Sequence, residues 1–330
     1  MSKAIFSLDN KRVWVAGHRG MVGSALVRRL ERENCEIVTS DRSLVDLRNQ
    51  AQVDKWVTDT KPNVVFLAAA KVGGILANDT YPVDFLYDNL MIQTNVITTA
   101  FKSGVEKLIF LGSSCAYPKF AIQPIAEESL LSGHLESTNQ WYAVAKISGI
   151  KLCQAYRKQY RADFICAMPS NLYGPGDKFD LNSSHVIPAL IRKANQAKLT
   201  GARELKIWGT GSPRREFLHV DDCADAVVFL SKFYSSESHV NVGAGKDISI
   251  LELAKLVAST VGFRGRIVCD LTKPDGTPKK LMNSNKLYEM GWQPEITLAL
   301  GIRSVYRWFI DSRMDDDRHA LDEHLNSCGK

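Results

Sequence analysis

The sequence lacks any long uninterrupted run of apolar residues. Its longest apolar stretches, such as residues 64–70 and 108–111, are far shorter than the roughly 20 residues that a membrane-spanning helix needs. Residues 1–12 are mixed and polar, without the apolar segment and small-residue cleavage site that mark an export signal. We therefore expect a cytoplasmic protein with no membrane partner.

Closely spaced cysteines and metal-ligand patterns are also absent. The chain has 7 cysteines, none of which forms a CxxC pair: Cys35, Cys115, Cys153, Cys166, Cys223, Cys269 and Cys328. A scattered, odd set is typical of a reducing compartment rather than of a disulfide framework. The histidines and carboxylates show no spacing typical of metal ligands, so we predict no metal.

Blocks of one charge sign, internal repeats and low-complexity tracts are missing too. The 42 Lys and Arg residues against 36 Asp and Glu give a net charge of +6, and basic residues mostly alternate with acidic ones. This pattern argues against a nucleic-acid partner and favours local basic residues that face an anionic small molecule. With 45% hydrophobic and 24% charged residues, the 330-residue chain has a globular composition and room for about two domains.

What the sequence does contain is an alternation of apolar, strand-like runs with segments of helical period. We expect strands at residues 12–16, 36–39, 63–67, 107–111 and 163–168, and helices at 21–33, 81–102 and 138–160. This order predicts repeated βαβ units, and hence an α/β fold with a Rossmann-type, doubly wound parallel sheet. After Pro169 the segments become shorter and richer in Gly, Pro and Asn, which predicts a smaller, loop-built domain for the substrate.

The first expected strand runs into a GxxGxxG motif. Gly17, Gly20 and Gly23 recur at every third position, and Met21 and Val22 begin the next expected helix. Glycines at this position let the backbone approach a pyrophosphate at a helix N-terminus. Three glycines can also serve only a tight turn and close helix packing. The strand, turn and helix order, followed by further βαβ units, favours dinucleotide binding.

The residues after the second expected strand bear on the choice of dinucleotide. An acidic residue there binds a ribose 2′-hydroxyl, whereas an arginine accommodates a 2′-phosphate. Arg42 at this place and Arg19 in the glycine loop favour NADP(H). Asp41 leaves NAD open as the alternative cofactor, because a carboxylate at this place can bind the 2′-hydroxyl. Arg42 can also be an ordinary solvated charge on the surface.

Three polar side chains are placed for carbonyl reduction. Ser113 follows the fourth expected strand, at the edge where open α/β sheets bind their ligands. Tyr142 and Lys146 are four residues apart and share one helix face. An ammonium beside a phenol favours the phenolate, and lysine can also hold a nicotinamide ribose. We predict that Ser113, Tyr142 and Lys146 converge over a nicotinamide.

These motifs resemble the extended short-chain dehydrogenase/reductase family that acts on nucleotide sugars, as do residues 169–175 (PSNLYGP) and 215–222 (REFLHVDD). The resemblance runs from about residue 12 to residue 309. Further strings at residues 17–23, 68–74, 112–115, 182–188 and 273–278 resemble the branch that acts on GDP-4-keto-6-deoxy-D-mannose. The resemblance implies NADPH-dependent 3,5-epimerisation and 4-keto reduction of that GDP-sugar.

The resemblance also implies roles for individual residues. Ser113, Tyr142 and Lys146 would form the reductase triad, and Cys115 with His185 the epimerisation pair. A thiol and an imidazole suit proton transfer beside a ketone, because their usual pKa values, about 8.5 and about 6.5, lie near neutrality. Taken alone, Cys115 could be a small buried hydrophobic residue and His185 a structural hydrogen bonder. Further cofactor contacts are implied for Ala69, Lys146 and His185, and substrate contacts for Asn171, Val186, Lys193, Trp208, Arg215 and Lys280.

The change of pattern after Pro169 suggests the domain organisation, and the resemblance implies the assembly. We place an NADP-binding Rossmann domain at residues 1–172 plus about 215–245, and a discontinuous C-terminal substrate domain at about 173–214 plus 246–312. We expect residues 313–330, which lie outside the residues described below, to be a polar tail. A homodimer is implied, with residues 81–102 and 138–160 of each subunit building a four-helix interface. Two rival functions stay open: a nucleotide-sugar 4-epimerase that retains NAD, and a non-catalytic dinucleotide sensor, against which the intact triad argues.

Overall fold

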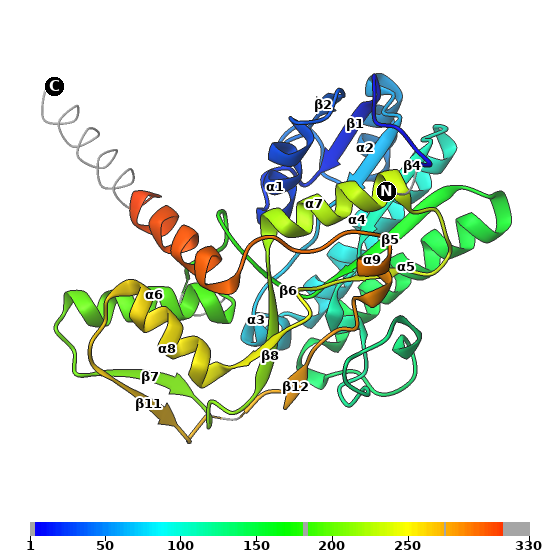
Figure 1. Cartoon of the computed structure of the whole chain (residues 1–330). Helices are drawn as coiled ribbons and strands as arrows, with labels where there is room; N and C mark the ends of the chain where they lie inside the picture. Colours follow the sequence, from blue (N-terminus) through cyan, green and yellow to red (C-terminus); the bar gives the residue numbers. More distant parts are fainter. Residues whose placement is uncertain (1–3, 181–183, 274, 313–330) are drawn as a thin grey trace, which may run out of the picture.

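The computed structural model describes residues 4–180, 184–273 and 275–312. Its main feature is a six-stranded parallel sheet in the order β2-β1-β3-β4-β5-β9, with helices on both faces (Figure 1). The strands are β1 (Arg12–Ala16), β2 (Glu36–Val38), β3 (Val64–Leu67), β4 (Lys107–Leu111), β5 (Asp163–Pro169) and β9 (Val240–Val242). Because β2 and β3 are added on opposite sides of β1, the strand order reverses there, and sheets of this kind bind ligands beyond that point. The predicted Rossmann sheet is confirmed.

Two helical layers cover this sheet because its strands are apolar on both faces. In β1, Val13 and Val15 join the core beside α1 (Met21–Leu30) and α7 (Val220–Phe233), whereas Trp14 and Ala16 join the core on the other face. That second core is covered by α2 (Gln50–Thr60), α4 (Pro82–Lys102) and α5 (Gln140–Tyr160). Alternate side chains of a strand point to opposite faces, so one short strand contributes to both cores.

The remaining short elements of this part connect the layers. They are α3 (Ile75–Thr80), η1 (Ser114–Ala116), η2 (Glu127–Ser129), η3 (Ser137–Asn139) and α9 (Asn285–Glu289). The expected helices at 81–102 and 138–160 are present, but α5 begins at Gln140 because residues 137–139 form the tighter turn η3. Within the described ranges, no helix is long and apolar enough to cross a membrane.

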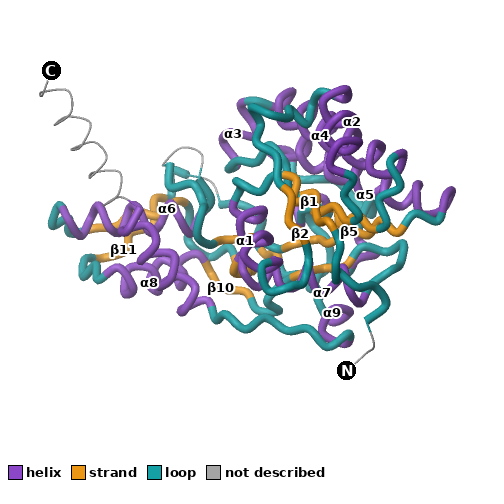
Figure 2. The backbone as a smooth tube through the Cα atoms, turned by 90° about the horizontal axis from the view of Figure 1, so that it is seen from above, coloured by secondary structure: helices purple, strands orange, loops and turns teal. Residues whose placement is uncertain are grey.

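The second part of the molecule has its own sheets and its own core. Strands β10 (Asp247–Ser249), β8 (Arg214–His219) and β12 (Lys279–Lys280) are adjacent, β6 (Asn171–Tyr173) also pairs with β8, and β7 (Glu204–Trp208) pairs with β11 (Arg266–Asp270). Helices α6 (Val186–Leu199) and α8 (Ile250–Val261) pack with helical residues 298–312 around one apolar cluster. In Figure 2 this part, marked by β11 and α8, lies at one end of the molecule, and β1 and β5 lie toward the other.

The expectation of a loop-built second domain is wrong, because α6 has 14 residues and α8 has 12. Helix α6 carries Pro188 in its first turn, where proline is tolerated since the N–H it lacks would be unpaired anyway. Helix α8 begins with a capping box between Ser249 and Glu252 and ends at Gly262 in the left-handed conformation. Leu287 and Trp292 return to the core beside α1 and α7, and the predicted domain boundaries stay a prediction.

Candidate active site

The turn between β1 and α1 is built for close backbone approach. Gly17 has φ +91°, and a Cβ there would lie 2.6 Å from the backbone N of Ala69. A Cβ on Gly23 would lie 2.1 Å from the carbonyl oxygen of Gly17. Gly20 is the N-cap of α1 and makes no side-chain hydrogen bond to it. The first N–H groups of α1, which begins with Met21 and Val22, can therefore receive an anion such as a pyrophosphate.

Of the two arginines near this turn, Arg19 is paired with Asp41, whereas Arg42 forms no ion pair in the described ranges. Arg19 donates a hydrogen bond of 2.7 Å to Asp41, and His18 Nε2 lies 3.3 Å from the same carboxylate. Arg42 is exposed, and no carboxylate in the described ranges forms an ion pair with it. The charge of Asp41 is therefore already balanced by Arg19, whereas Arg42 is available to a phosphate.

Ser113 and Tyr142 meet at the carboxyl end of β4. Ser113 caps η1, where its Oγ accepts a 3.3 Å hydrogen bond from the backbone N–H of Cys115. Its side chain is also hydrogen-bonded to Tyr142, which lies in the first turn of α5. The Tyr142 ring meets Phe85 of α4 edge-on, with ring centroids 6.5 Å apart. The strand end and the helix start thus hold both hydroxyls at one point.

Lys146 lies one turn further along α5 and is almost fully buried. Its Nζ donates a 2.8 Å hydrogen bond to the carbonyl oxygen of Leu111 and lies 5.8 Å from the centre of the Tyr142 ring. Burial lowers the pKa of Lys146 to about 8. The pKa of Tyr142 is raised by burial and by the charge of Cys115, against the hydrogen bond from Ser113.

The sequence-based expectation that Lys146 would favour the phenolate is therefore wrong for this structure. The ammonium is directed to the Leu111 carbonyl, and desolvation of the phenol dominates its pKa. Tyr142 consequently keeps its proton at neutral pH. In that state it can donate a proton to a substrate oxygen.

Cys115 lies in η1, two residues after Ser113. The amide Nδ2 of Asn139 donates to its sulfur at 3.4 Å. Burial lowers the pKa of Arg215 on β8, and the charge of Cys115 acts in the opposite direction. Unlike Cys153 or Cys166, Cys115 is only partly buried, so it is not a core residue. Asn139 was not singled out from the sequence, because only the fold brings it to this sulfur.

His185 occupies the N-cap of α6, directly before Val186. Desolvation lowers the pKa of His185 and the charge of Lys178 adds to the effect, although water still reaches the residue. The imidazole is therefore neutral at pH 7. The structure shows no hydrogen bond between His185 and Cys115 in the described residues, so their pairing stays a prediction.

Two cations on adjacent strands have no acidic partner among the residues that the structure describes. Arg215 of β8 and Lys280 of β12 are register partners. Their neighbours Arg214 and Lys279 form ion pairs with Asp247, at 2.7 and 3.2 Å. Because side chains alternate along a strand, Arg215 and Lys280 lie on the opposite face, where no ion pair of the described chain involves them. This face can neutralise a diphosphate.

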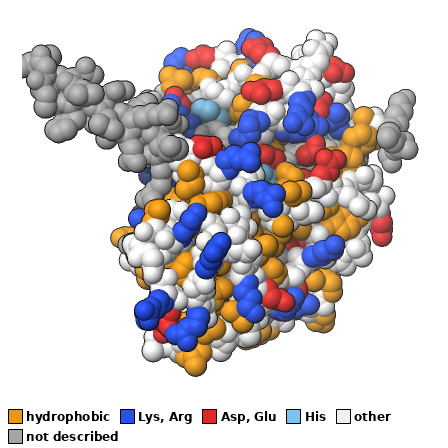
Figure 3. Space-filling model, turned by 60° about the vertical axis from the view of Figure 1, so that its left-hand side comes forward, with side chains coloured by type: hydrophobic (Ala, Val, Ile, Leu, Met, Phe, Trp, Pro, Cys, Tyr) orange, Lys and Arg blue, Asp and Glu red, His pale blue; other side chains and the backbone are white. Residues whose placement is uncertain are grey.

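The other predicted substrate residues come from β6, α6, which carries Val186 and Lys193, and β7. Asn171 of β6 donates a 2.8 Å hydrogen bond to the carbonyl oxygen of Glu216. Trp208, at the end of β7, is 58% exposed, and the ammonium groups of Lys193 and Lys273 lie 5.6 and 5.7 Å from its ring centre. Lys273 was not singled out, although it begins the KPDG string. Basic side chains are scattered over the face shown in Figure 3, including its centre.

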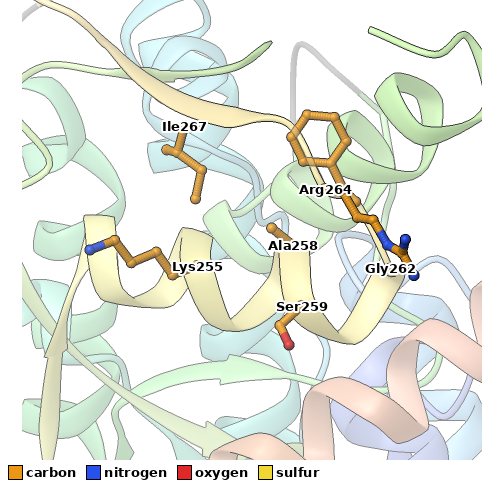
Figure 4. Close-up of a pocket in the computed structure, with 7 residues that line it drawn as sticks. Lys255, Ala258, Ser259, Gly262, Arg264 and Ile267 are labelled. Carbon is orange, nitrogen blue, oxygen red and sulfur yellow. The ribbon is translucent and has the colours of Figure 1, made fainter. Parts of the chain in front are cut away.

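A surface groove of about 480 Å³ lies elsewhere, on α8 and the start of β11. All of its lining residues fall within residues 255–267, and Figure 4 shows Lys255 and Arg264 at opposite ends of it. It contains none of the predicted site residues. The candidate active site is therefore the region where β4, α5 and β8 meet, not this groove.

Comparison with known proteins agrees with this geometry. Residues 13–243 match the NAD dependent epimerase/dehydratase family. The chain is 60% identical over 312 residues to a GDP-L-fucose synthase of Sinorhizobium fredii, covering 94% of this chain and 99% of the relative. It is 56% identical over 309 residues to GDP-L-fucose synthase 1 of Arabidopsis thaliana, covering 93% and 96%.

A solved structure extends the comparison to three dimensions. A GDP-L-fucose synthetase from Naegleria fowleri bound to NADP superimposes with a TM-score of 0.86 at 26% identity, covering 95% of this chain and 98% of that one. The match includes both the six-stranded sheet and the smaller part, since it spans nearly the whole chain. The chain belongs to the NAD dependent epimerase/dehydratase family, in the group of the GDP-L-fucose synthases.

Proposed function

We propose that this enzyme converts GDP-4-keto-6-deoxy-D-mannose to GDP-L-fucose, by epimerisation at carbons 3 and 5 and NADPH-dependent reduction at carbon 4. The observation that carries the proposal is the position of Cys115 beside the pair Ser113 and Tyr142. Reduction alone needs only the hydroxyl pair and Lys146. A partly exposed thiol in the same cluster adds a base for the C–H bonds that flank the ketone.

The glycine turn and its surroundings fit NADP(H). The absence of side chains at Gly17, Gly20 and Gly23 leaves the N-terminus of α1 open to the pyrophosphate. Arg42, with help from Arg19, would hold the 2′-phosphate. Further contacts would come from Met21, Val22, Ala69, Lys146 and His185. When bound, NADPH supplies the hydride for carbon 4.

Reduction needs a proton at the ketone oxygen as hydride reaches the carbon. Tyr142 is the proton donor, since burial keeps its phenol protonated. The Ser113 hydroxyl is hydrogen-bonded to Tyr142, and from this position it also holds the ketone oxygen of the substrate in place. Lys146 is buried one turn away and keeps the nicotinamide ribose near them.

Epimerisation needs a base on one face of the sugar and an acid on the other. Cys115, as the thiolate, removes the proton from carbon 3 or carbon 5, and the ketone oxygen takes up the negative charge as an enolate. His185, which is open to water, takes up a proton from solvent and delivers it as the imidazolium to the opposite face. The two steps use different side chains from the hydride step, so they can be separated by mutation.

The GDP moiety would bind across the smaller part. Arg215 and Lys280 face the diphosphate, because charge-assisted pairs to phosphate are the strong ones and neither cation forms an ion pair with an acidic residue in the described chain. Trp208 with Lys193 offers a flat, cation-flanked surface for the base. Asn171 and Val186 line the sugar between these groups.

Product identification tests the proposal against its rivals. The protein is incubated with GDP-4-keto-6-deoxy-D-mannose and NADPH, and the product is identified by chromatography and NMR. We expect GDP-L-fucose, with one NADPH consumed per product. A 4-epimerase that retains NAD would be purified with dinucleotide absorbance and consume none, and a sensor would bind NADPH without turnover; either result would reject the proposal.

We also infer a homodimer through α4 and α5. These helices pack against each other through the rings of Phe101, Tyr156 and Tyr160. They leave several large apolar side chains exposed: Val83, Tyr87, Trp141, Val144 and Tyr160. A second copy would cover this surface in a four-helix interface. Light scattering that finds a stable monomer at micromolar concentration would contradict the dimer.

A further inference from the structure

We propose that Asn139 is a positioning residue for epimerisation, whose amide holds the Cys115 sulfur in place and stabilises its thiolate. The inference rests on the proposed role of Cys115 as the base. Asn139 Nδ2 lies 3.4 Å from the sulfur and donates to it. Among the described residues, this is the one side-chain hydrogen bond that the structure shows to Cys115 Sγ.

The backbone holds Asn139 in this position before any substrate arrives. Asn139 ends the short turn η3, and its N–H donates a 3.2 Å hydrogen bond to the carbonyl oxygen of Glu136. The Glu136 carboxylate accepts a hydrogen bond from the N–H of Thr138 and forms a 2.8 Å ion pair with Lys119. The turn that carries the amide is therefore fixed at both its cap and its end.

The amide suits a sulfur that changes its protonation state. The first half of each epimerisation breaks one C–H bond and forms one S–H bond, while the electron pair of the C–H bond passes into the enolate. In the second half the enolate forms a new C–H bond with the proton from His185, and the thiol returns its proton to solvent. The Nδ2–H of Asn139 can donate to the thiolate that starts the step. Its Oδ1 is buried and has no hydrogen-bond partner in the described chain. If the amide turns over, Oδ1 accepts from the thiol that ends the step.

No other described group near Cys115 is placed both to donate a hydrogen bond to its sulfur and to accept one from it. Arg215 acts on it through charge from β8, and Tyr142 is a neutral phenol on α5. Ser113 Oγ accepts from the backbone N–H of Cys115, not from its sulfur. Asn139 is therefore the side chain that both donates to the sulfur and offers a free acceptor beside it.

Two substitutions and two measurements test this role. Asn139→Ala removes the amide, and Asn139→Asp keeps its shape but replaces the donor by a second negative charge. Alkylation of Cys115 by iodoacetamide is followed against pH by peptide mass spectrometry. Deuterium uptake at carbons 3 and 5 is measured in heavy water with substrate and NADP⁺. The buried Cys153 is an internal control in every digest, and NADPH titration checks that each variant is folded.

We expect Asn139→Ala to raise the midpoint pH of Cys115 alkylation by about one unit and to slow deuterium uptake roughly tenfold, as the loss of a hydrogen bond to a charged group predicts. Asn139→Asp should shift the midpoint further in the same direction. An unmoved midpoint in Asn139→Asp overturns the proposal, even if Asn139→Ala does not fold. Unchanged uptake in Cys115→Ser would instead refute the proposed base itself.

Discussion

Replacing Tyr142 by phenylalanine should slow reduction strongly while sparing epimerisation. The substitution removes one hydroxyl and leaves the ring, which keeps its edge-on contact with Phe85. Binding and stability should therefore change little. What is lost is the proton donor hydrogen-bonded to Ser113. Because burial raises the pKa of Tyr142, the wild-type residue is protonated at neutral and mildly alkaline pH, so the full effect is measurable there.

The expected loss can be bounded. General-acid help is typically about 10²- to 10⁴-fold, which corresponds to roughly 3 to 5 kcal/mol of transition-state stabilisation. We therefore expect the rate of NADPH oxidation to fall by at least about 10².

Two assays on one preparation separate the half-reactions. NADPH oxidation reports reduction, and deuterium uptake from heavy water in the presence of NADP⁺ reports epimerisation. Tyr156→Phe is the matched control, because Tyr156 also lies on α5 but packs against Phe101 and Phe164. Cys115→Ser should give the reverse pattern, with little uptake at either carbon. A near-normal rate of NADPH oxidation in Tyr142→Phe would refute the reasoning.

The sheet could be predicted from the sequence because its strands are continuous apolar runs. All residues of Val64–Leu67 and Lys107–Leu111 are buried, and such runs need no tertiary partner to be recognised. Helix α2 was missed, because Val53 and Val57 are its only buried residues in the structure. Its cap, Asn49, was a readable start signal. Segments with a weak apolar face depend on what the fold places beside them.

The site was predicted in its parts but not in its interactions. The positions of Ser113 and Tyr142 followed from strand ends and from residue spacing. The hydrogen bond from Lys146 to Leu111 could not be predicted in this way, because it depends on how closely α5 approaches β4. Asn139 lies 24 residues from the cysteine that it contacts, and no periodicity relates two such positions. The sequence pattern therefore predicts which residues form the site, whereas the direction of a pKa shift can be read only from the packed structure.

Three further perturbations test the cofactor site and the fold. Arg42→Ala should narrow the preference for NADPH over NADH about tenfold or more, as the loss of a charge-assisted contact predicts; equal use of both cofactors by the wild type would contradict this. Since the pKa of Lys146 is about 8, its ammonium is lost as pH rises through that value, so NADPH affinity should fall above pH 8 in the wild type and stay flat in Lys146→Met. Lys107→Ala should destabilise the fold by about 3 kcal/mol in urea unfolding, because breaking a buried pair costs roughly 3 to 5 kcal/mol and its partner is partly exposed. Lys107 is fully buried and bonded to Asp163 at 2.7 Å, whose carboxylate is 26% exposed and can regain some water. Lys107→Met restores the apolar volume and should recover part of the loss, whereas a Lys107→Ala protein as stable as the wild type would mean that the ion pair contributes nothing.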